Sequence, residues 1–186
     1  MKNTLKPASR VFAVLVFTMG LSGCLGIPDN MEPVEGFELD RYLGTWYEIA
    51  RMDHSFERGL SNVSAQYNLR DGGVTVINRG YNVSKGKWKE AVGKAFFIGD
   101  PSIGRLKVSF FGPFYGAYNI VALDQEAYQW SLVVGPDTDY LWILARDTTL
   151  DEATKEQILA TASSHGFNTD ELIFVEHDLA EVSLQQ

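Results

Sequence analysis

The sequence predicts an all-β protein in which eight antiparallel strands form an up-and-down barrel or a sandwich, followed by one C-terminal α-helix. Short β-prone runs separated by Gly, Pro and Asp recur from residue 44 to residue 146. Aromatic residues make up 12% of the chain and glycines number 17, a composition that favours strands joined by tight turns. With 186 residues, 45% of them hydrophobic, the chain is long enough for one domain with a sizeable core.

The strands are predicted in order from alternation and turn signals. The second strand, 63–70, gives the clearest signal, because every other residue is apolar, and Asp71-Gly72-Gly73 after it predicts a tight hairpin turn. The other predicted strands are 45–52, 74–81, 88–98, 105–111, 118–123, 128–134 and 140–146.

One helix is predicted after the last of these strands. Asp151 is suited to cap its N-terminus, and Gly166 stands where a glycine commonly ends a helix. Between them Ile158 and Ala162 lie at helical spacing and make a narrow apolar face. Residues 172–175 then predict a short additional strand.

The N-terminal 23 residues are typical of a secretory signal peptide. Three basic residues and no acid precede an apolar run at 11–19. Only 13 residues separate Arg10 from Cys24, whereas a membrane-spanning helix needs about 20. We therefore interpret residues 1–23 as a cleaved signal rather than as a permanent membrane span.

The end of this signal carries a second motif. Leu21-Ser22-Gly23-Cys24 resembles the lipobox of bacterial lipoproteins, in which the cysteine is acylated and becomes the mature N-terminus. The resemblance implies a membrane anchor through acylated Cys24, and Leu25 in place of Asp implies the periplasmic face of the outer membrane. The alternative is an ordinary signal peptide in which the cysteine stands by chance.

Three further segments are predicted beyond the signal. Residues 24–37 are rich in Gly and Pro, which predicts a lipidated cysteine with a flexible tether. The thirteen residues 25–37, fully extended, reach at most roughly 40 Å, enough to hold a domain clear of a membrane. The barrel and its helix are expected over 38–178, and residues 179–186 are expected to form a tail.

Charge and composition exclude several classes of function. Lys and Arg total 16 and Asp and Glu total 24, so the net charge is −8 and nucleic-acid binding is not expected. Loss of residues 1–23 removes three basic residues, which leaves 13 basic and 24 acidic ones, net −11. Such a surface is expected to gain nothing from anionic lipid, so the acyl chains would do the anchoring. One cysteine and three histidines without ligand spacing predict neither a metal site nor a cofactor.

Three short motifs stand in order along the predicted strands. Gly44 and Trp46 open the first strand, Thr138-Asp139-Tyr140 leads into the eighth, and Arg146 ends it. Together they resemble the signatures of the lipocalins, specifically the bacterial outer-membrane lipoprotein lipocalins that are similar to apolipoprotein D. The resemblance covers roughly residues 38–178. It implies a closed eight-stranded barrel with Trp46 at its closed end and Arg146 stacked across the indole.

Alternation along the strands, counted from an inward-pointing Trp46, predicts which side chains face the interior; Ala50 is among them. The predicted ligand-binding cavity is lined by Glu48, Ala65, Tyr67, Val76, Asn78, Phe97, Val108, Phe110, Tyr118, Ser131, Val133 and Trp142. This mainly apolar set with a few polar groups is typical of a small-molecule site. The alternative is that these side chains simply fill the core.

Two segments outside the strands carry further expectations, and the first of them is expected at the open end of such a barrel. The loop 53–60 carries Phe56 and Leu60, which either cover a ligand or pack as parts of an ordinary polar loop. The aromatic turn near Phe114 and Tyr115 is expected to touch a membrane, to pair with a second subunit in a homodimer, or to pack locally.

The resemblance favours a lipid-anchored lipocalin that binds and stores or transports fatty acids or lysophospholipids in the cell envelope. An enzyme is the less favoured reading, because the sequence has no G-x-S-x-G elbow, no phosphate-binding loop and no redox thiol. Glu48 is the one candidate for a perturbed catalytic acid. A structural or partner-binding envelope lipoprotein with a filled barrel is the third reading.

Overall fold

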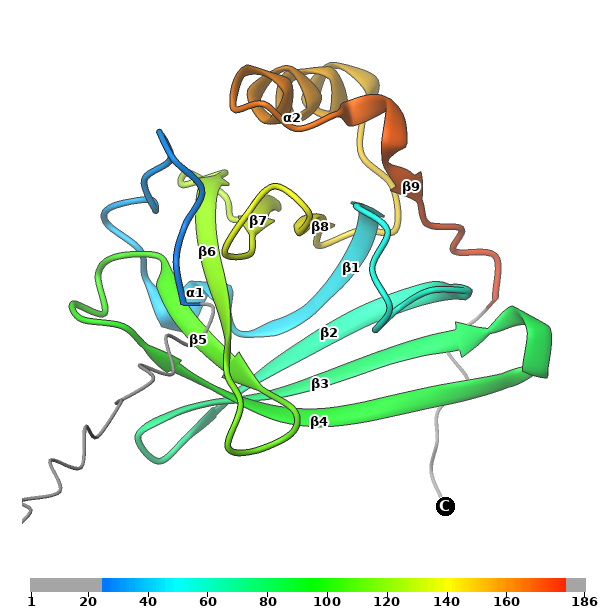
Figure 1. The fold of residues 1–186 in the computed structure, drawn as a ribbon, viewed down its shortest axis with the longest axis horizontal. Helices are drawn as coiled ribbons and strands as arrows, with labels where there is room; N and C mark the ends of the chain where they lie inside the picture. The colour runs from blue at the N-terminus through cyan, green and yellow to red at the C-terminus, as the bar shows by residue number, and fades with distance from the viewer. Residues whose placement is uncertain (1–24, 180–186) are drawn as a thin grey trace, which may run out of the picture.

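The computed structural model describes residues 25–179 of the chain (Figure 1). The predicted signal peptide 1–23, the predicted acylation site Cys24 and residues 180–186 of the predicted tail lie outside these residues. Within the described part, no helix has the length and apolar character needed to cross a membrane.

Eight antiparallel strands close into a barrel, which rules out the sandwich. The strand β1 pairs with β8 on one side and with β2 on the other, and every other strand pairs with its neighbours in sequence. A short strand β9 pairs with β1 outside this ring. The strands are β1 (Gly44–Arg51), β2 (Leu60–Arg70), β3 (Gly73–Asn82), β4 (Lys87–Phe97), β5 (Arg105–Ser109), β6 (Gly116–Leu123), β7 (Trp130–Val134), β8 (Leu141–Ala145) and β9 (Ile173–Phe174).

Most predicted strand boundaries are correct within two or three residues. The seventh strand was expected from residue 128, but β7 begins at Trp130. Tyr128 has a φ of 56°, in the left-handed region that extended strands do not adopt. Two short 3₁₀ helices, η1 (Val83–Lys85) and η2 (Thr169–Glu171), have no counterpart in the prediction.

The C-terminal helix α2 (Glu152–Ser164) confirms the predicted helix and its cap. The Asp151 carboxylate accepts a hydrogen bond of 3.0 Å from the backbone N–H of Thr154, and Gly166 follows the helix with a φ of 88°. Ile158 and Ala162 are buried in a cluster with residues of β1, β7 and β8. The helix therefore covers the outer face of these strands, at the top of the molecule in Figure 1.

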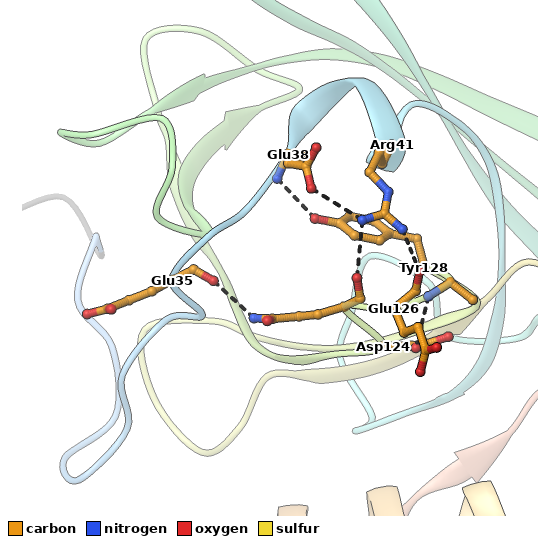
Figure 2. A network of polar contacts seen from close by, with 8 residues as sticks. Glu35, Glu38, Arg41, Asp124, Glu126 and Tyr128 are labelled. Carbon is orange, nitrogen blue, oxygen red and sulfur yellow. Dashed lines mark hydrogen bonds and ion pairs between the residues drawn. The ribbon is translucent and has the colours of Figure 1, made fainter.

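A single helical turn, α1 (Leu39–Tyr42), lies at the end of the barrel where β1 begins, and no sequence signal predicted it. Figure 2 shows how it is tied to the loop between β6 and β7. The backbone N–H of Glu38 donates to the Tyr128 hydroxyl at 3.0 Å, and Arg41 donates to the carbonyl of Glu126 at 2.7 Å. These bonds fix α1 across the closed end.

Trp46 and Arg146 complete this closed end. Trp46 is fully buried, and its indole N–H donates to the Tyr42 carbonyl at 2.8 Å. The Arg146 guanidinium lies 4.0 Å from the centre of the indole ring. It also donates to the carbonyls of Thr45 at 2.8 Å and Arg41 at 2.7 Å. The structure thus has the stacked pair that the family resemblance implies.

Residues 25–37 pack against the barrel, so the prediction of a flexible tether is wrong for them. The N–H of Val34 donates to the Ile120 carbonyl, and the Val34 carbonyl accepts from Gly104, both at 2.8 Å. Met31 and Phe37 are buried. The glycines and prolines of this segment break regular secondary structure without freeing the chain, because its apolar side chains and backbone groups find partners on the barrel.

Candidate functional site

The barrel interior holds a hydrophobic cluster distinct from the one under α2. The predicted cavity residues that belong to the interior cluster or pack against it are Ala65, Tyr67, Val76, Phe97, Val108, Phe110, Tyr118, Val133 and Trp142. Glu48 and Ser131 are buried and bond to interior side chains, and Asn78 shares its face of β3 with Val76. Alternation therefore identified inward positions on all eight strands.

Several interior side chains keep part of their surface accessible. Phe97, Val108, Phe110, Tyr118 and Trp142 pack against the interior cluster, yet each is only half-buried. A side chain that points inward and is still accessible borders space that its neighbours do not fill. The interior is thus open along part of its apolar wall.

Ala50 was predicted to face the interior and does not. Glu48 is opposite Leu144 on β8, whereas Ala50 is opposite Ile143, so the register shifts between the two positions. This β-bulge turns Ala50 to the outer cluster and turns Arg51 inward, where it is 1% exposed. A bulge changes the facing of every later residue in a strand, and no residue pattern in this strand signals it.

Three tyrosines form a hydrogen-bonded chain inside the barrel. The Tyr118 hydroxyl lies 2.8 Å from the hydroxyls of both Tyr42 and Tyr67. The Tyr42 hydroxyl also lies 2.9 Å from Ser131 Oγ. Tyr42 comes from α1, which is why alternation along the strands did not identify it. The hydroxyls of Tyr67 and Tyr118, two of the polar groups of the predicted cavity, are therefore already hydrogen-bonded within the protein.

This chain predicts a loss of stability at alkaline pH. Burial raises the pKa of Tyr42 from 10.0 to about 12, against hydrogen bonds from Ser131 and Tyr118 that lower it. Burial also raises the pKa values of Tyr67 and Tyr118. Above pH 10 the unfolded chain ionises first, so each such tyrosine removes up to about 1.4 kcal/mol of stability per pH unit. Urea unfolding between pH 9 and pH 11 should show this decline, and Tyr42→Phe should make it shallower.

An ion pair lies buried where β1 approaches the open end. Arg51 Nη1 is 2.7 Å from Glu48 Oε1, with both side chains almost fully buried. Arg51 Nη2 donates to the carbonyls of Glu57 at 3.0 Å and Leu60 at 3.3 Å. One guanidinium thus holds together β1, the start of β2 and the loop between them. Arg51 was not identified from the sequence, because the bulge reverses its expected direction.

The β1–β2 loop turns charged side chains inward. Glu57 Oε2 lies 3.0 Å from His54 Nε2 and accepts a hydrogen bond of 3.0 Å from the indole N–H of Trp142. Phe56, for which covering a ligand and packing within the loop were the two alternatives, is 69% exposed. Because Trp142 packs against the interior cluster, Glu57 anchors this loop at the mouth. In this structure the Glu57 carboxylate holds the loop to the barrel.

The pKa values of the two carboxyl groups in this cluster, Glu48 and Glu57, are shifted in opposite directions. Burial raises the pKa of Glu48 well above its usual value, the nearby Glu57 charge raises it further, and Arg51 opposes both. Burial also acts to raise the pKa of Glu57, but the bonds from His54 and Trp142 and the Arg51 charge outweigh it and lower the pKa. The difference favours a proton on Glu48 rather than on Glu57.

The buried polar atoms without a hydrogen-bond partner among the described residues include Arg51 Nε, on β1, and Asn78 Oδ1, on β3. An unpaired donor and an unpaired acceptor in an apolar interior are suited to a polar group that arrives with a ligand. Among residues 25–179, no group of three or more His, Asp and Glu side chains is arranged to hold a metal ion.

The motif Thr138-Asp139-Tyr140 lies in the loop between β7 and β8, as predicted. A hollow of about 270 Å³ borders Asp139, Tyr140 and His54 on the outside of the mouth. It is lined by none of the predicted cavity residues. In the aromatic turn between β5 and β6, Phe114 is 70% exposed, whereas Tyr115 is half-buried against Phe96.

Comparisons with known proteins agree with this architecture. Residues 37–177 match the family model of a lipocalin-like domain. The solved structure of insecticyanin from the tobacco hornworm Manduca sexta superposes with a TM-score of 0.67 at 24% identity, covering 84% of this chain and 88% of that one. At that identity the likeness concerns the fold alone.

Curated relatives are closer in sequence. The chain is 50% identical over 168 residues to the outer membrane lipoprotein Blc of Vibrio cholerae, which covers 90% of this chain and 98% of that protein. It is 55% identical over 150 residues to the protein of that name in Escherichia coli, which covers 80% and 84%. Apolipoprotein D of Rattus norvegicus is 34% identical over 146 residues, 74% and 75% of the two chains.

Proposed function

Because this chain belongs to the lipocalin family and is a lipid-anchored lipoprotein of the outer membrane, we propose that it binds fatty acids or lysophospholipids inside its barrel. It would store or carry them within the cell envelope, held at the membrane by acylation of Cys24. The mass of the mature protein tests the acylation, since a chain that starts at an unmodified Cys24 contradicts it.

The observation that carries this proposal is the accessible apolar wall of the interior, formed by side chains such as Phe97, Val108 and Phe110. An eight-stranded barrel has room for one small ligand. An acyl chain laid along this wall would gain about 0.8 kcal/mol for each CH₂ that it buries. Because the barrel has room for only one small ligand, a lipid with one acyl chain suits it better than a lipid with two.

The polar cluster at the mouth supports an amphiphilic ligand. Arg51 Nε could donate to a carboxylate or phosphate oxygen, and Asn78 Oδ1 could accept from a hydroxyl or ammonium group. The loop that holds Glu57 against Trp142 would have to swing out before a ligand enters. Binding is then reversible burial, and no bond is made or broken.

Trp142→Arg is expected to weaken binding of lysophospholipid and of free fatty acid at least tenfold. The substitution places a charge on the interior wall and removes the indole N–H that donates to Glu57 at 3.0 Å. Residues 25–186 contain every described strand and helix, so this soluble chain serves for separate titrations with each lipid, followed by tryptophan fluorescence.

Trp88→Arg is the matched control, because Trp88 packs on Tyr81, on the face of β3–β4 opposite to Val76 and Ala95. Equal affinity in the Trp142 variant and the wild type would contradict the proposed wall. If the wild type binds neither lipid, a barrel filled by its own side chains and a role in binding partner proteins become the better reading. A homodimer is a further proposal, tested by sedimentation of the same sample.

A further inference from the structure

The charges of this acidic protein are segregated between two halves of the barrel. Residues 73–123, from β3 to β6, contain seven basic and two acidic residues, net +5. The remaining described residues contain six basic and 21 acidic ones, net −15. The net charge of the whole chain is therefore the sum of a basic half and a strongly acidic remainder, and the expectation about anionic lipid was based on that sum alone.

The basic half has an outer face that none of the helices in residues 25–179 covers. Ala95 and Leu106 belong to the interior cluster, so their neighbours Lys94 and Lys107 point outward. α2 packs on β1, β7 and β8 instead, at the opposite side of the barrel in Figure 1. We call the outward surface of β3, β4 and β5 the basic wall.

Aromatic and apolar side chains accompany the lysines on this wall. Lys107 Nζ lies 5.1 Å from the ring centre of Tyr115, which packs on Phe96. Val92 is 58% exposed on the same face, and Phe114, in the turn after β5, is 70% exposed. Lysine with Tyr, Trp and exposed apolar residues is the combination found where proteins meet lipid headgroups.

The lysines of the basic wall have no carboxylate partner among the described residues. Lys94 and Lys107 point outward on the wall, and neither makes an ion pair with a carboxylate of the described residues. On the same face Arg79 does pair with Glu90, at 2.8 Å, unlike these two lysines. Their charge is thus available to an anionic partner.

The N-terminal end of the described chain lies beside this wall. The Leu25 carbonyl accepts a hydrogen bond of 3.2 Å from Arg105 Nη2, and Leu25 directly follows Cys24. Arg105 lies on β5 with its side chain on the same face as Lys107, about 7 Å away along the strand. An acyl chain on Cys24 would therefore enter the bilayer beside the wall, because residues 25–37 are packed rather than extended.

We propose that the basic wall is a second membrane contact, which docks the barrel on the anionic phospholipid headgroups of the bilayer that holds the acyl anchor. The inference rests on the proposed acylation of Cys24 for its location, but its charge and apolar contacts act without the acyl chain. This contact holds the barrel in one orientation on the bilayer, whereas an acyl anchor alone would leave the barrel free to reorient.

The test uses unacylated residues 25–186 with vesicles of phosphatidylcholine alone or mixed with phosphatidylglycerol. We expect binding that requires phosphatidylglycerol and weakens with added salt. Lys94→Gln and Lys107→Gln should each weaken it about fivefold, and the double variant about 25-fold. Lys155→Gln, which neutralises a lysine on α2, is the matched control and should leave binding unchanged.

Binding that ignores phosphatidylglycerol, or that falls equally in the Lys155 variant, overturns the proposal. A wild type that sediments as a dimer without lipid, and as a monomer in the double variant, would make the wall a contact between two copies and also overturns it. Lipid-ligand titration of the same variants separates this result from the barrel's function, since none of these lysines faces the interior.

Discussion

Replacing Arg51 with Met should destabilise the protein by about 3–5 kcal/mol at pH 7, because it breaks a buried ion pair from one side. The variant leaves the Glu48 carboxyl, which is 2% exposed, without the guanidinium that lies 2.7 Å away. It also leaves the Glu57 and Leu60 carbonyls without their donor. Urea unfolding followed by tryptophan fluorescence measures the loss, and the loop at the mouth should become more accessible to protease.

The pH dependence of this loss identifies its cause. Burial already raises the pKa of Glu48, and removing Arg51 raises it further. When the pKa of a carboxyl is higher in the folded than in the unfolded state, the protein loses stability as the pH rises above the unfolded-state pKa. The Met variant should therefore be least stable above pH 7 and should regain stability towards pH 5. A loss that does not change over this range would contradict an uncompensated Glu48 charge.

Two variants serve as controls for the Arg51 result. Glu48→Gln keeps the size and an acceptor for Arg51, so its loss should be smaller, about 1–2 kcal/mol. Arg58→Met removes an arginine of the same loop, whose pair with Asp53 has side chains that are 64% and 46% exposed. Water screens such a pair, and no measurable change is expected.

The barrel itself was predictable because its signals are local. Alternation with period two places apolar residues on one face of each strand, as along β2, and Gly, Pro and Asp mark the turns. Asp151 and Gly166 begin and end the helix through contacts and backbone angles within a few residues of themselves, so both helix ends were predicted correctly. The stack of Arg146 on Trp46 joins distant residues and came from the family resemblance instead.

The parts that the sequence did not reveal depend on tertiary contacts. The bulge after Glu48 exchanges the directions of Ala50 and Arg51, and with it the buried cation of the mouth was missed. Residues 25–37 look like a linker because they contain Gly and Pro, yet the barrel supplies partners for their backbone. The excess of basic residues at 73–123 is itself local, and it was missed because net charge was summed over the whole chain; the structure shows that this stretch forms neighbouring strands β3–β6.

Arg146→Ala should cost about 3–5 kcal/mol, the other large effect that we expect. The guanidinium stacks 4.0 Å from the centre of the Trp46 ring, a contact worth about 1–2 kcal/mol where water is excluded. It also donates to the carbonyls of Thr45 at 2.8 Å, Arg41 at 2.7 Å and Tyr128 at 3.3 Å. Charge-assisted bonds of this kind contribute about 1.5–3 kcal/mol each when buried, and less here because Arg146 is half-buried.

Arg146→Lys distinguishes the contribution of the positive charge from that of the several N–H donors of the guanidinium. An ammonium group can stay over the indole but cannot reach three carbonyls in one plane, so about half of the loss should remain. Arg41→Ala is the matched control, since Arg41 also lies over a ring, 4.1 Å from the centre of Tyr128, but its side chain is 38% exposed. Its loss should be about 1 kcal/mol. If the two Ala variants unfold at the same urea concentration, the closed end is not held by Arg146, and the packing of Trp46 against Tyr42 stabilises it alone.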